Sequence, residues 1–89
     1  MNNKIILASI ASDLKRIALG LHRGSQTTVD RFTQEVLRRK QEIDNPILEN
    51  YMQKWVSKLD SAVNNSDDAL MLSTIFQNYS QAVSPNEKA

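Results

Sequence analysis

The sequence predicts an all-α protein, an antiparallel four-helix bundle with up-down-up-down topology. Apolar residues recur at steps of three and four in four separate segments, as on one face of an amphipathic helix. The segments span about residues 3–23, 28–44, 46–64 and 67–83, and short polar turns join them. The 89 residues include no cysteine, so one core is expected to form without disulfides or thiolate-bound metals.

The first helix is predicted over residues 3–23, where one face is continuously apolar. Asp13 is placed off this face. Ile5 and Leu19 lie on the far side, where a second chain would cover them. Gly24 suits the left-handed residue that ends many helices. The residues of the inward face are Ile6, Leu7, Ile10, Leu14, Ile17, Ala18 and Leu21.

The second helix is predicted over residues 28–44 and is the least apolar. Thr27 and Asp30 have the spacing of a capping box at its start. Arg39 and Lys40 occupy an inward turn, where their aliphatic stems are expected to cover apolar surface while their charges reach water. The apolar members of the inward face are Val29, Phe32, Val36 and Ile43.

The third helix, predicted over residues 46–64, has the clearest amphipathic pattern and is expected to form the floor of the core. Asn45 suits the N-cap and Pro46 the first helical position, because a residue before proline avoids the α region. Trp55 lies in the middle of the apolar face, where an indole can bury the most apolar area.

The fourth helix is predicted over residues 67–83, with Ser66 as its N-cap. Its outer side, which is expected to include Ser73, has an unusual composition. No charged residue occurs from Ala69 to Asn86. A solvated helix normally carries Lys or Glu, whereas interfaces are depleted in charge. This side, with the outward apolar residues of the first helix, is therefore the predicted partner-binding surface. Its residues are Leu70, Met71, Thr74, Gln77, Gln81, Ile5 and Leu19. Residues 1–83 form the single predicted domain, and 84–89 a frayed tail.

Charge is unevenly distributed, although the net charge is only plus one. Residues 1–40 contain eight Lys and Arg against three acids, and residues 41–89 contain three against seven. The two halves of one bundle are expected to attract each other. The alternative is a basic first hairpin that binds nucleic acid through phosphate contacts. The residues of this alternative site are Lys15, Arg16, Arg23, Arg38, Arg39 and Lys40.

The sequence contains little reactive chemistry. No pair of residues has metal-ligand spacing and no glycine-rich phosphate loop is present, so neither a metal nor a cofactor is predicted. His22 is the only histidine. Its place near the end of the first helix suits an interaction with the last carbonyl groups. The chain is therefore predicted not to be an enzyme.

Two short patterns supply an enzymatic alternative, which is ribonuclease-like or phosphotransfer chemistry at His22. Residues 21–25 partly resemble the phosphorylated-histidine segment of histidine phosphotransfer domains, although there the basic residue and the glycine follow one turn later. Arg16 with His22 is similar to the Arg-x5-His motif of HEPN ribonucleases, but Ile17 stands where a polar residue usually follows the arginine. Six residues also place the two side chains about 120° apart on a helix. Neither family is assigned.

The predicted function is a small non-catalytic protein-protein interaction or regulatory module that self-associates as a homodimer. Burial of apolar helix faces would supply the affinity. In an alternative architecture, two helical hairpins complete their core only by pairing with a second chain. Nucleic acid is a less favoured partner, and no segment is long enough to cross a membrane. The lack of cysteine and the broken apolar run after Lys4 favour the cytoplasm.

Overall fold

The computed structural model describes residues 2–81 and shows an all-helical chain. Two long helices come first, α1 (Asn3–Arg23) and α2 (Gln26–Lys40). There follow a 3-10 turn, η1 (Asn45–Ile47), two short helices, α3 (Asn50–Val56) and α4 (Leu59–Ala62), and a last helix, α5 (Ser66–Gln81). No strand occurs in residues 2–81, and the predicted all-α class is confirmed.

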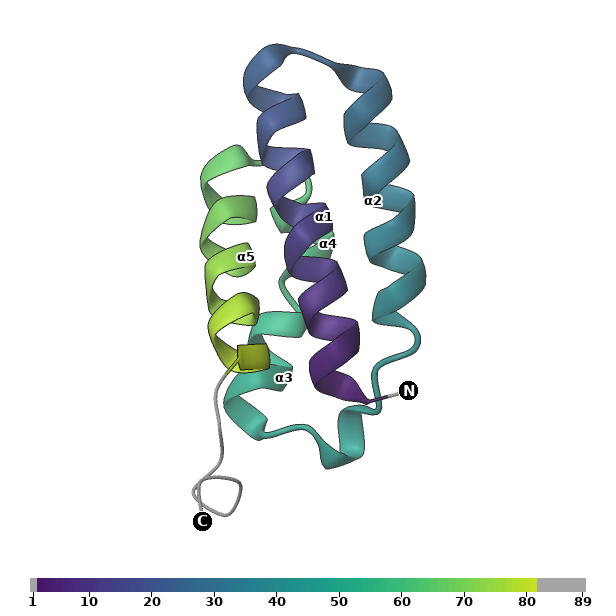
Figure 1. Ribbon diagram of the computed structural model, residues 1–89, viewed down its shortest axis with the longest axis vertical. Coiled ribbons are helices and arrows are strands. Elements are labelled where there is room, and N and C mark those ends of the chain that lie inside the picture. Colours follow the sequence, from purple (N-terminus) through teal and green to yellow (C-terminus); the bar gives the residue numbers. More distant parts are fainter. Residues whose placement is uncertain (1, 82–89) are drawn as a thin grey trace.

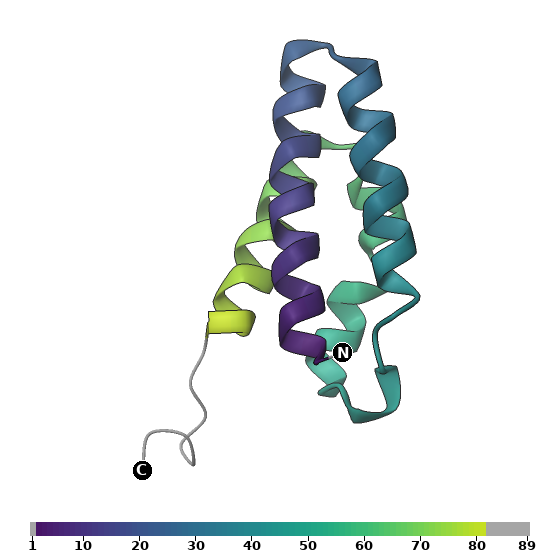
Figure 2. The same ribbon diagram turned by 45° about the vertical axis from the view of Figure 1, so that its right-hand side comes forward.

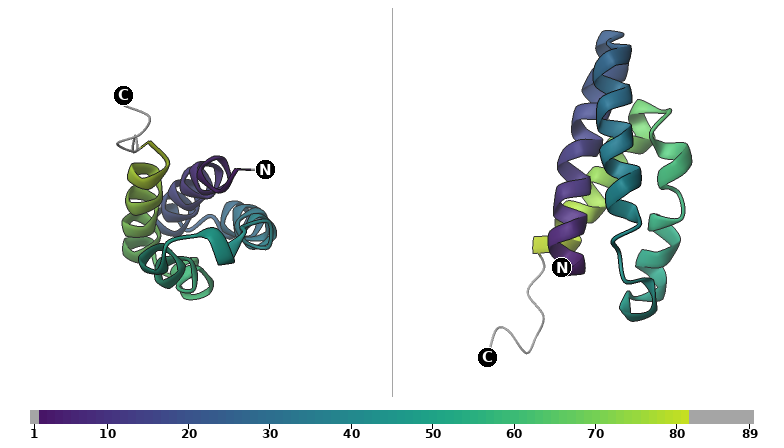
Figure 3. Two further views of the ribbon diagram at one scale, coloured as in Figure 1. Left: turned by 90° about the horizontal axis from the view of Figure 1, so that it is seen from below. Right: turned by 90° about the vertical axis from the view of Figure 1, so that its right-hand side faces the viewer.

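The central helix of the fold is α1. In Figure 1 it lies between α5 and α2, with α4 behind it. The turned view in Figure 2 shows α1 and α2 side by side, joined by a short turn. Seen from below in Figure 3, α1, α2, the α3–α4 segment and α5 surround one interior. Because α1 packs against both α5 and α2, it organises the core in place of the third predicted helix.

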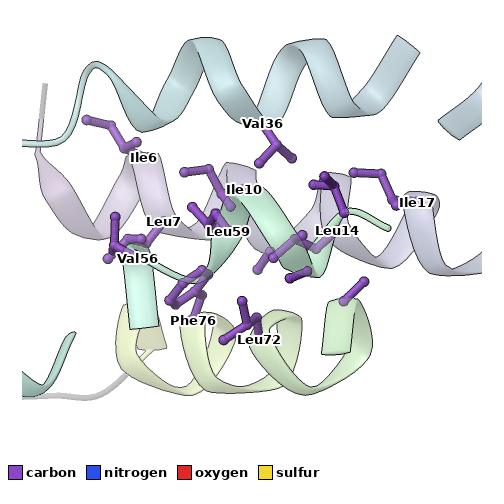
Figure 4. Close-up of a cluster of buried hydrophobic side chains, with 14 of the residues drawn as sticks. Ile6, Leu7, Ile10, Leu14, Ile17, Val36, Val56, Leu59, Leu72 and Phe76 are labelled. Atoms are coloured by element: carbon purple, nitrogen blue, oxygen red, sulfur yellow. The ribbon is translucent and has the colours of Figure 1, made fainter. Parts of the chain in front are cut away.

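The core is closed within one copy of the chain. From α1, Ile6, Leu7, Ile10, Leu14 and Ile17 are fully buried. Val36 of α2, Leu59 of α4 and Phe76 of α5 meet them and are also fully buried (Figure 4). Removing apolar surface from water stabilises the fold by about 25 cal/mol per Å². The side chains of this core are covered by other parts of the same chain.

Gly24 ends α1, as predicted. Its φ of 74° lies in the left-handed region. The Ser25 amide donates to the carbonyl oxygen of Gly20 at 2.8 Å, which is the hydrogen bond of a helix C-cap motif. The helix that follows begins at Gln26, so Thr27 lies inside it. The predicted capping box that starts at Thr27 is therefore wrong, because a capping residue must precede the helix.

The loop after α2 is fastened to the start of α1. This helix ends at Lys40 rather than near residue 44. The side-chain amide of Asn3 donates from Nδ2 to the Asp44 carbonyl oxygen at 3.1 Å. Its Oδ1 accepts from the Asp44 backbone amide at 2.9 Å. These two bonds satisfy backbone groups that the early end of α2 leaves open.

The third predicted helix is broken into three pieces. Pro46 lies in η1, and Leu48 then leaves the helical region with a ψ of 139°. The prediction that Asn45 and Pro46 start the helix is therefore wrong, since α3 begins only at Asn50. A second break separates α3 from α4, where the Ser57 hydroxyl donates to the Lys54 carbonyl oxygen at 2.6 Å. Serine side chains compete in this way with helical backbone bonds.

The last helix begins close to its predicted start but has a different cap. The Asn65 Oδ1 atom accepts from the Asp68 backbone amide at 3.0 Å, so Asn65 and not Ser66 caps α5. Ser73, expected on the outer side, is buried with 8% exposure. The predicted end at residue 83 and the predicted frayed tail, 84–89, lie outside the described residues.

Candidate functional site

The predicted partner-binding residues all lie at the surface. Exposed fractions are 57% for Ile5, 45% for Leu19, 46% for Leu70 and 43% for Met71. Thr74, Gln77 and Gln81 are exposed as well. We call Leu70, Met71, Thr74, Gln77 and Gln81 the α5 outer face. It combines exposed apolar side chains with uncharged polar ones, which is the composition found at protein interfaces.

The structure divides this predicted surface among three hollows. Leu70, Thr74 and Gln77 line a groove of about 390 Å³ between α1 and α5. Met71 lies instead in a groove between α4 and α5. Leu19 lines a hollow between α1 and α2. Ile5 and Gln81 line none of these three, so the seven predicted residues are not gathered in one hollow.

A buried hydrogen bond holds the groove between α1 and α5. The Ser73 hydroxyl donates to the Ala11 carbonyl oxygen at 2.7 Å, and both residues line the groove. A buried hydroxyl needs such a partner because leaving it unpaired costs about 1–3 kcal/mol. The other α1 residues of the lining are Ser12 and Lys15, and Lys15 is the one charged residue among the described residues there.

Ion pairs neutralise much of the charge on α2, which belongs to the alternative nucleic-acid site. Arg38 lies 2.6 Å from Glu35 and 3.9 Å from Glu42. Arg39 lies 3.9 Å from Glu35 and reaches across to Asp13 of α1 at 3.6 Å. A guanidinium that already has carboxylate partners gives less net attraction to a phosphate.

The other four basic residues of that site lie apart. Lys40 pairs with Asp60 of α4 at 3.2 Å, and Arg16 pairs with Asp13 at 3.2 Å. Lys15 lines the α1–α5 groove, whereas Arg16 and Arg23 line the hollow between α1 and α2. The six predicted cations are therefore not brought together into a single basic groove.

Asp13 is buried between the two arginines, although the sequence placed it off the apolar face. Its exposure is 7%. Burial raises the pKa of this carboxyl above its ordinary value, and the charges of Arg39 and Arg16 act in the opposite direction. Desolvation outweighs the two favourable charges. Asp13 thus joins α1 to α2 as a buried acid with two cationic partners.

We call the hollow between α1 and α2 the basic hollow. It has a volume of about 330 Å³, and no acidic residue of the described chain lines it. The Arg16 guanidinium carbon lies 5.2 Å from the centre of the Phe32 ring, an arrangement that holds the cation against an aromatic wall. The lining residues are Arg16, Leu19, Gly20, Arg23, Ser25, Thr28 and Phe32.

No protein-family model, curated protein or solved structure matches this chain. Over residues 2–81, no helix combines the length and the apolar character that a membrane crossing requires. The same residues hold no group of three His, Cys, Asp or Glu side chains placed to bind a metal ion. Function is therefore inferred from the surfaces described above.

His22 lies in the last turn of α1, close to the predicted helix end, and its side chain is exposed. Because α1 is continuous from Asn3 to Arg23, Arg16 and His22 point about 120° apart around one helix. Arg16 faces the basic hollow and Asp13. A general acid or base has to converge with its partner on one reacting group, and this arrangement does not bring the two together.

A cluster that the apolar spacing of the sequence did not predict lies where α1, α3 and α5 meet. The Tyr79 hydroxyl donates to Glu49 Oε1 at 2.5 Å. The Tyr51 ring lies edge-on to Tyr79 with 6.4 Å between ring centres, and Lys4 Nζ lies 6.0 Å from the centre of the Tyr79 ring. The hydrogen bond lowers the pKa of Glu49. Burial, and then the neighbouring carboxylate, raise the pKa of Tyr79.

Proposed function

We propose that this chain is a small non-catalytic interaction or regulatory module that self-associates as a homodimer. The observation that carries the proposal is the α5 outer face, where Leu70 is 46% and Met71 43% exposed. From Ala69 to Gln81 the helix has no charged residue that would oppose burial of this face. We also propose that the helices form an antiparallel up-down-up-down bundle, in which α3 and α4 together take the third position.

A second copy suits the α5 outer face as its partner. A two-fold interface uses the same surfaces of both copies, and a charge buried in it without a partner is costly. A helix face without charge avoids this cost. The core is already closed in one copy, so the proposed dimer joins two finished surfaces. The alternative of two open hairpins that share one core has less support for the same reason.

The test of self-association is the mass of the protein in solution. We expect the mass from sedimentation equilibrium to rise from monomer to dimer with concentration. Leu70→Lys should raise the dimer dissociation constant by at least about tenfold, because a charge must then be buried at the contact. Ile47→Lys is the matched control, since Ile47 is 74% exposed on η1 and outside the α5 outer face. An unchanged dissociation constant for the Leu70 variant would reject this surface.

Nucleic-acid binding remains the second candidate, and its support is the exposed pair Lys15 and Arg23. Neither makes an ion pair with another residue in the range 2–81. Because only these two of the six predicted cations lie outside the described ion pairs, we expect no salt-dependent mobility shift of duplex DNA or RNA at micromolar protein. A shift that weakens steeply with salt and is lost in Arg23→Gln would favour this candidate over the first.

A cytoplasmic location is part of the proposal, because the chain has no cysteine that an oxidising compartment would pair. The enzymatic alternative depends on His22 alone. His22→Ala should leave self-association unchanged. A ribonuclease or phosphotransfer activity that is present in the wild type and lost in this variant would instead establish chemistry at His22.

A further inference from the structure

Charge in this chain is only partly balanced within one copy. Residues 1–40 hold eight Lys and Arg against three acids, and residues 41–89 hold three against seven. Of the six ion pairs described above, four lie within residues 1–40, and two, Arg38 with Glu42 and Lys40 with Asp60, join the halves. Asp67 and Asp68, at the start of α5, take part in none of these six pairs. A second copy presents the same two oppositely charged regions.

The basic hollow carries the positive side of this imbalance. Arg23 is exposed there and makes no ion pair with any other residue of the described chain. Leu19, 45% exposed, and the ring of Phe32 provide an apolar wall beside it. Arg16 is held in place by Asp13 at 3.2 Å. The hollow therefore suits an acid that is followed closely by an apolar side chain.

The first two turns of α5 provide that combination. Asp67, Leu70 and Thr74 are spaced three and four residues apart and share one exposed stripe of the helix. Asp67 and Asp68 are exposed, and neither makes an ion pair within residues 2–81. Beyond Asp68 the described helix is uncharged. The stripe thus begins with an acid and continues with an exposed leucine.

We propose that the basic hollow of one copy receives the first two turns of α5 from a second copy. In this contact Asp67 of one copy faces Arg23 of the other. Leu70 packs against Leu19 and Phe32, which removes apolar surface from water on both sides. Two such contacts, related by a two-fold axis, close the homodimer. The inference rests on the self-association proposed above and specifies which surfaces meet.

A charge-swap experiment tests the pairing. Arg23→Glu and Asp67→Lys each place like charges opposite each other in a homodimer, so each should raise the dissociation constant by about tenfold at low salt. In a mixed dimer of the two variants, one contact keeps the wild-type pair, and the other joins the two substituted side chains with their charges exchanged. Both contacts of the mixed dimer therefore join opposite charges, and the mixture should recover dimers in sedimentation equilibrium.

Two control variants make the same changes of charge elsewhere on the chain. Lys54 and Asp44 are exposed and lie outside both proposed surfaces. Lys54→Glu and Asp44→Lys should therefore dimerise as the wild type does. A loss of dimers in these controls as large as in Arg23→Glu and Asp67→Lys would show that net charge, and not the proposed pairing, governs the association.

Each outcome decides a different point. A wild type that stays monomeric at a concentration of about 0.5 mM, where even weak dimers form, overturns both this pairing and the self-association. A dimer that Leu70→Lys weakens but that neither Arg23→Glu nor Asp67→Lys affects overturns the pairing and leaves the self-association standing. If the single variants dissociate and their mixture does not recover dimers, the proposed pairing is also wrong, since the two charges then act independently.

Discussion

The Ser73 hydroxyl donates a 2.7 Å hydrogen bond to the main-chain carbonyl oxygen of Ala11, and this buried contact joins α5 to α1. It lies at the bottom of the groove whose rim includes Leu70 and Thr74. The bond adds one polar contact to the apolar packing of α5 against α1. It helps to hold the α5 outer face in position relative to α1.

Ser73→Ala should lower the free energy of unfolding by about 1 kcal/mol, because it removes this buried hydrogen bond. Urea denaturation monitored by the single tryptophan measures the change. Ser61→Ala is a matched control, since the exposed Ser61 hydroxyl bonds only within its own turn, to the Lys58 carbonyl oxygen. The control should change stability by less than about 0.5 kcal/mol. Equal losses in the two variants would show that the Ser73 bond contributes nothing specific.

The fold class and the limits of α1 could be predicted because both depend on local signals. The apolar face of α1 repeats without interruption, and Gly24 supplies the positive φ that ends it. The breaks at Pro46 and Ser57 could not be predicted from apolar spacing. Leu48, Val56 and Leu59 are buried next to the breaks. The spacing of apolar residues therefore looks like that of one continuous helix and does not indicate the breaks.

The exposure of the candidate site could be predicted, but its division among three hollows could not. An uncharged stripe of α5 indicates which side faces away from the core. Which neighbour lies beside each edge depends on how the helices pack, so Met71 faces α4 while Leu70 faces α1. The sequence placed Asp13 and Ser73 on the solvent side because polar residues are usually exposed, whereas both are buried and each has a polar partner on another helix.

Gly20→Ala should destabilise the protein by about 1 kcal/mol, although alanine is the better helix former. A Cβ atom at Gly20 would lie 3.0 Å from Val29 Cγ2 and 3.2 Å from Thr28 Cγ2, where α1 and α2 approach closely. Valine is stiff at χ1 and cannot turn away easily. In a double-mutant cycle, the protein with both Gly20→Ala and Val29→Ala should lose less free energy of unfolding than the two single variants lose in sum. An additive cycle, or a stabilised Gly20→Ala protein, would contradict the close approach.

Asp13→Asn should change how stability depends on pH. Burial raises the pKa of Asp13 in the folded protein above its ordinary value of 3.8. A carboxyl with a raised folded pKa contributes stability that is fully present below the unfolded value and is lost as pH rises through the folded one. Relative to Asp13→Asn, the wild type should therefore be more stable at about pH 3 than at about pH 6.5. Guanidinium denaturation at both values measures the difference. A difference that favours the wild type more at the higher pH would mean that Arg16 and Arg39 outweigh burial.

Because of the Tyr79–Glu49 hydrogen bond, stability should fall both at acid pH, where Glu49 is protonated, and at alkaline pH, where Tyr79 ionises. The folded pKa of Glu49 is lowered below 4.5, chiefly by the Tyr79 hydroxyl, so its contribution is present above 4.5 and lost as pH falls through the folded value. The folded pKa of Tyr79 is raised above 10.0 by burial and then by Glu49, so its contribution is lost as pH rises.

Glu49→Gln removes the neighbouring charge but not the burial. In a phenolate absorbance titration, with Tyr79→Phe to assign the signal, Tyr79 should therefore ionise at a lower pH in Glu49→Gln than in the wild type, and still above its ordinary value. Identical titrations of the two proteins would show that the carboxylate of Glu49 does not act on the Tyr79 hydroxyl in solution.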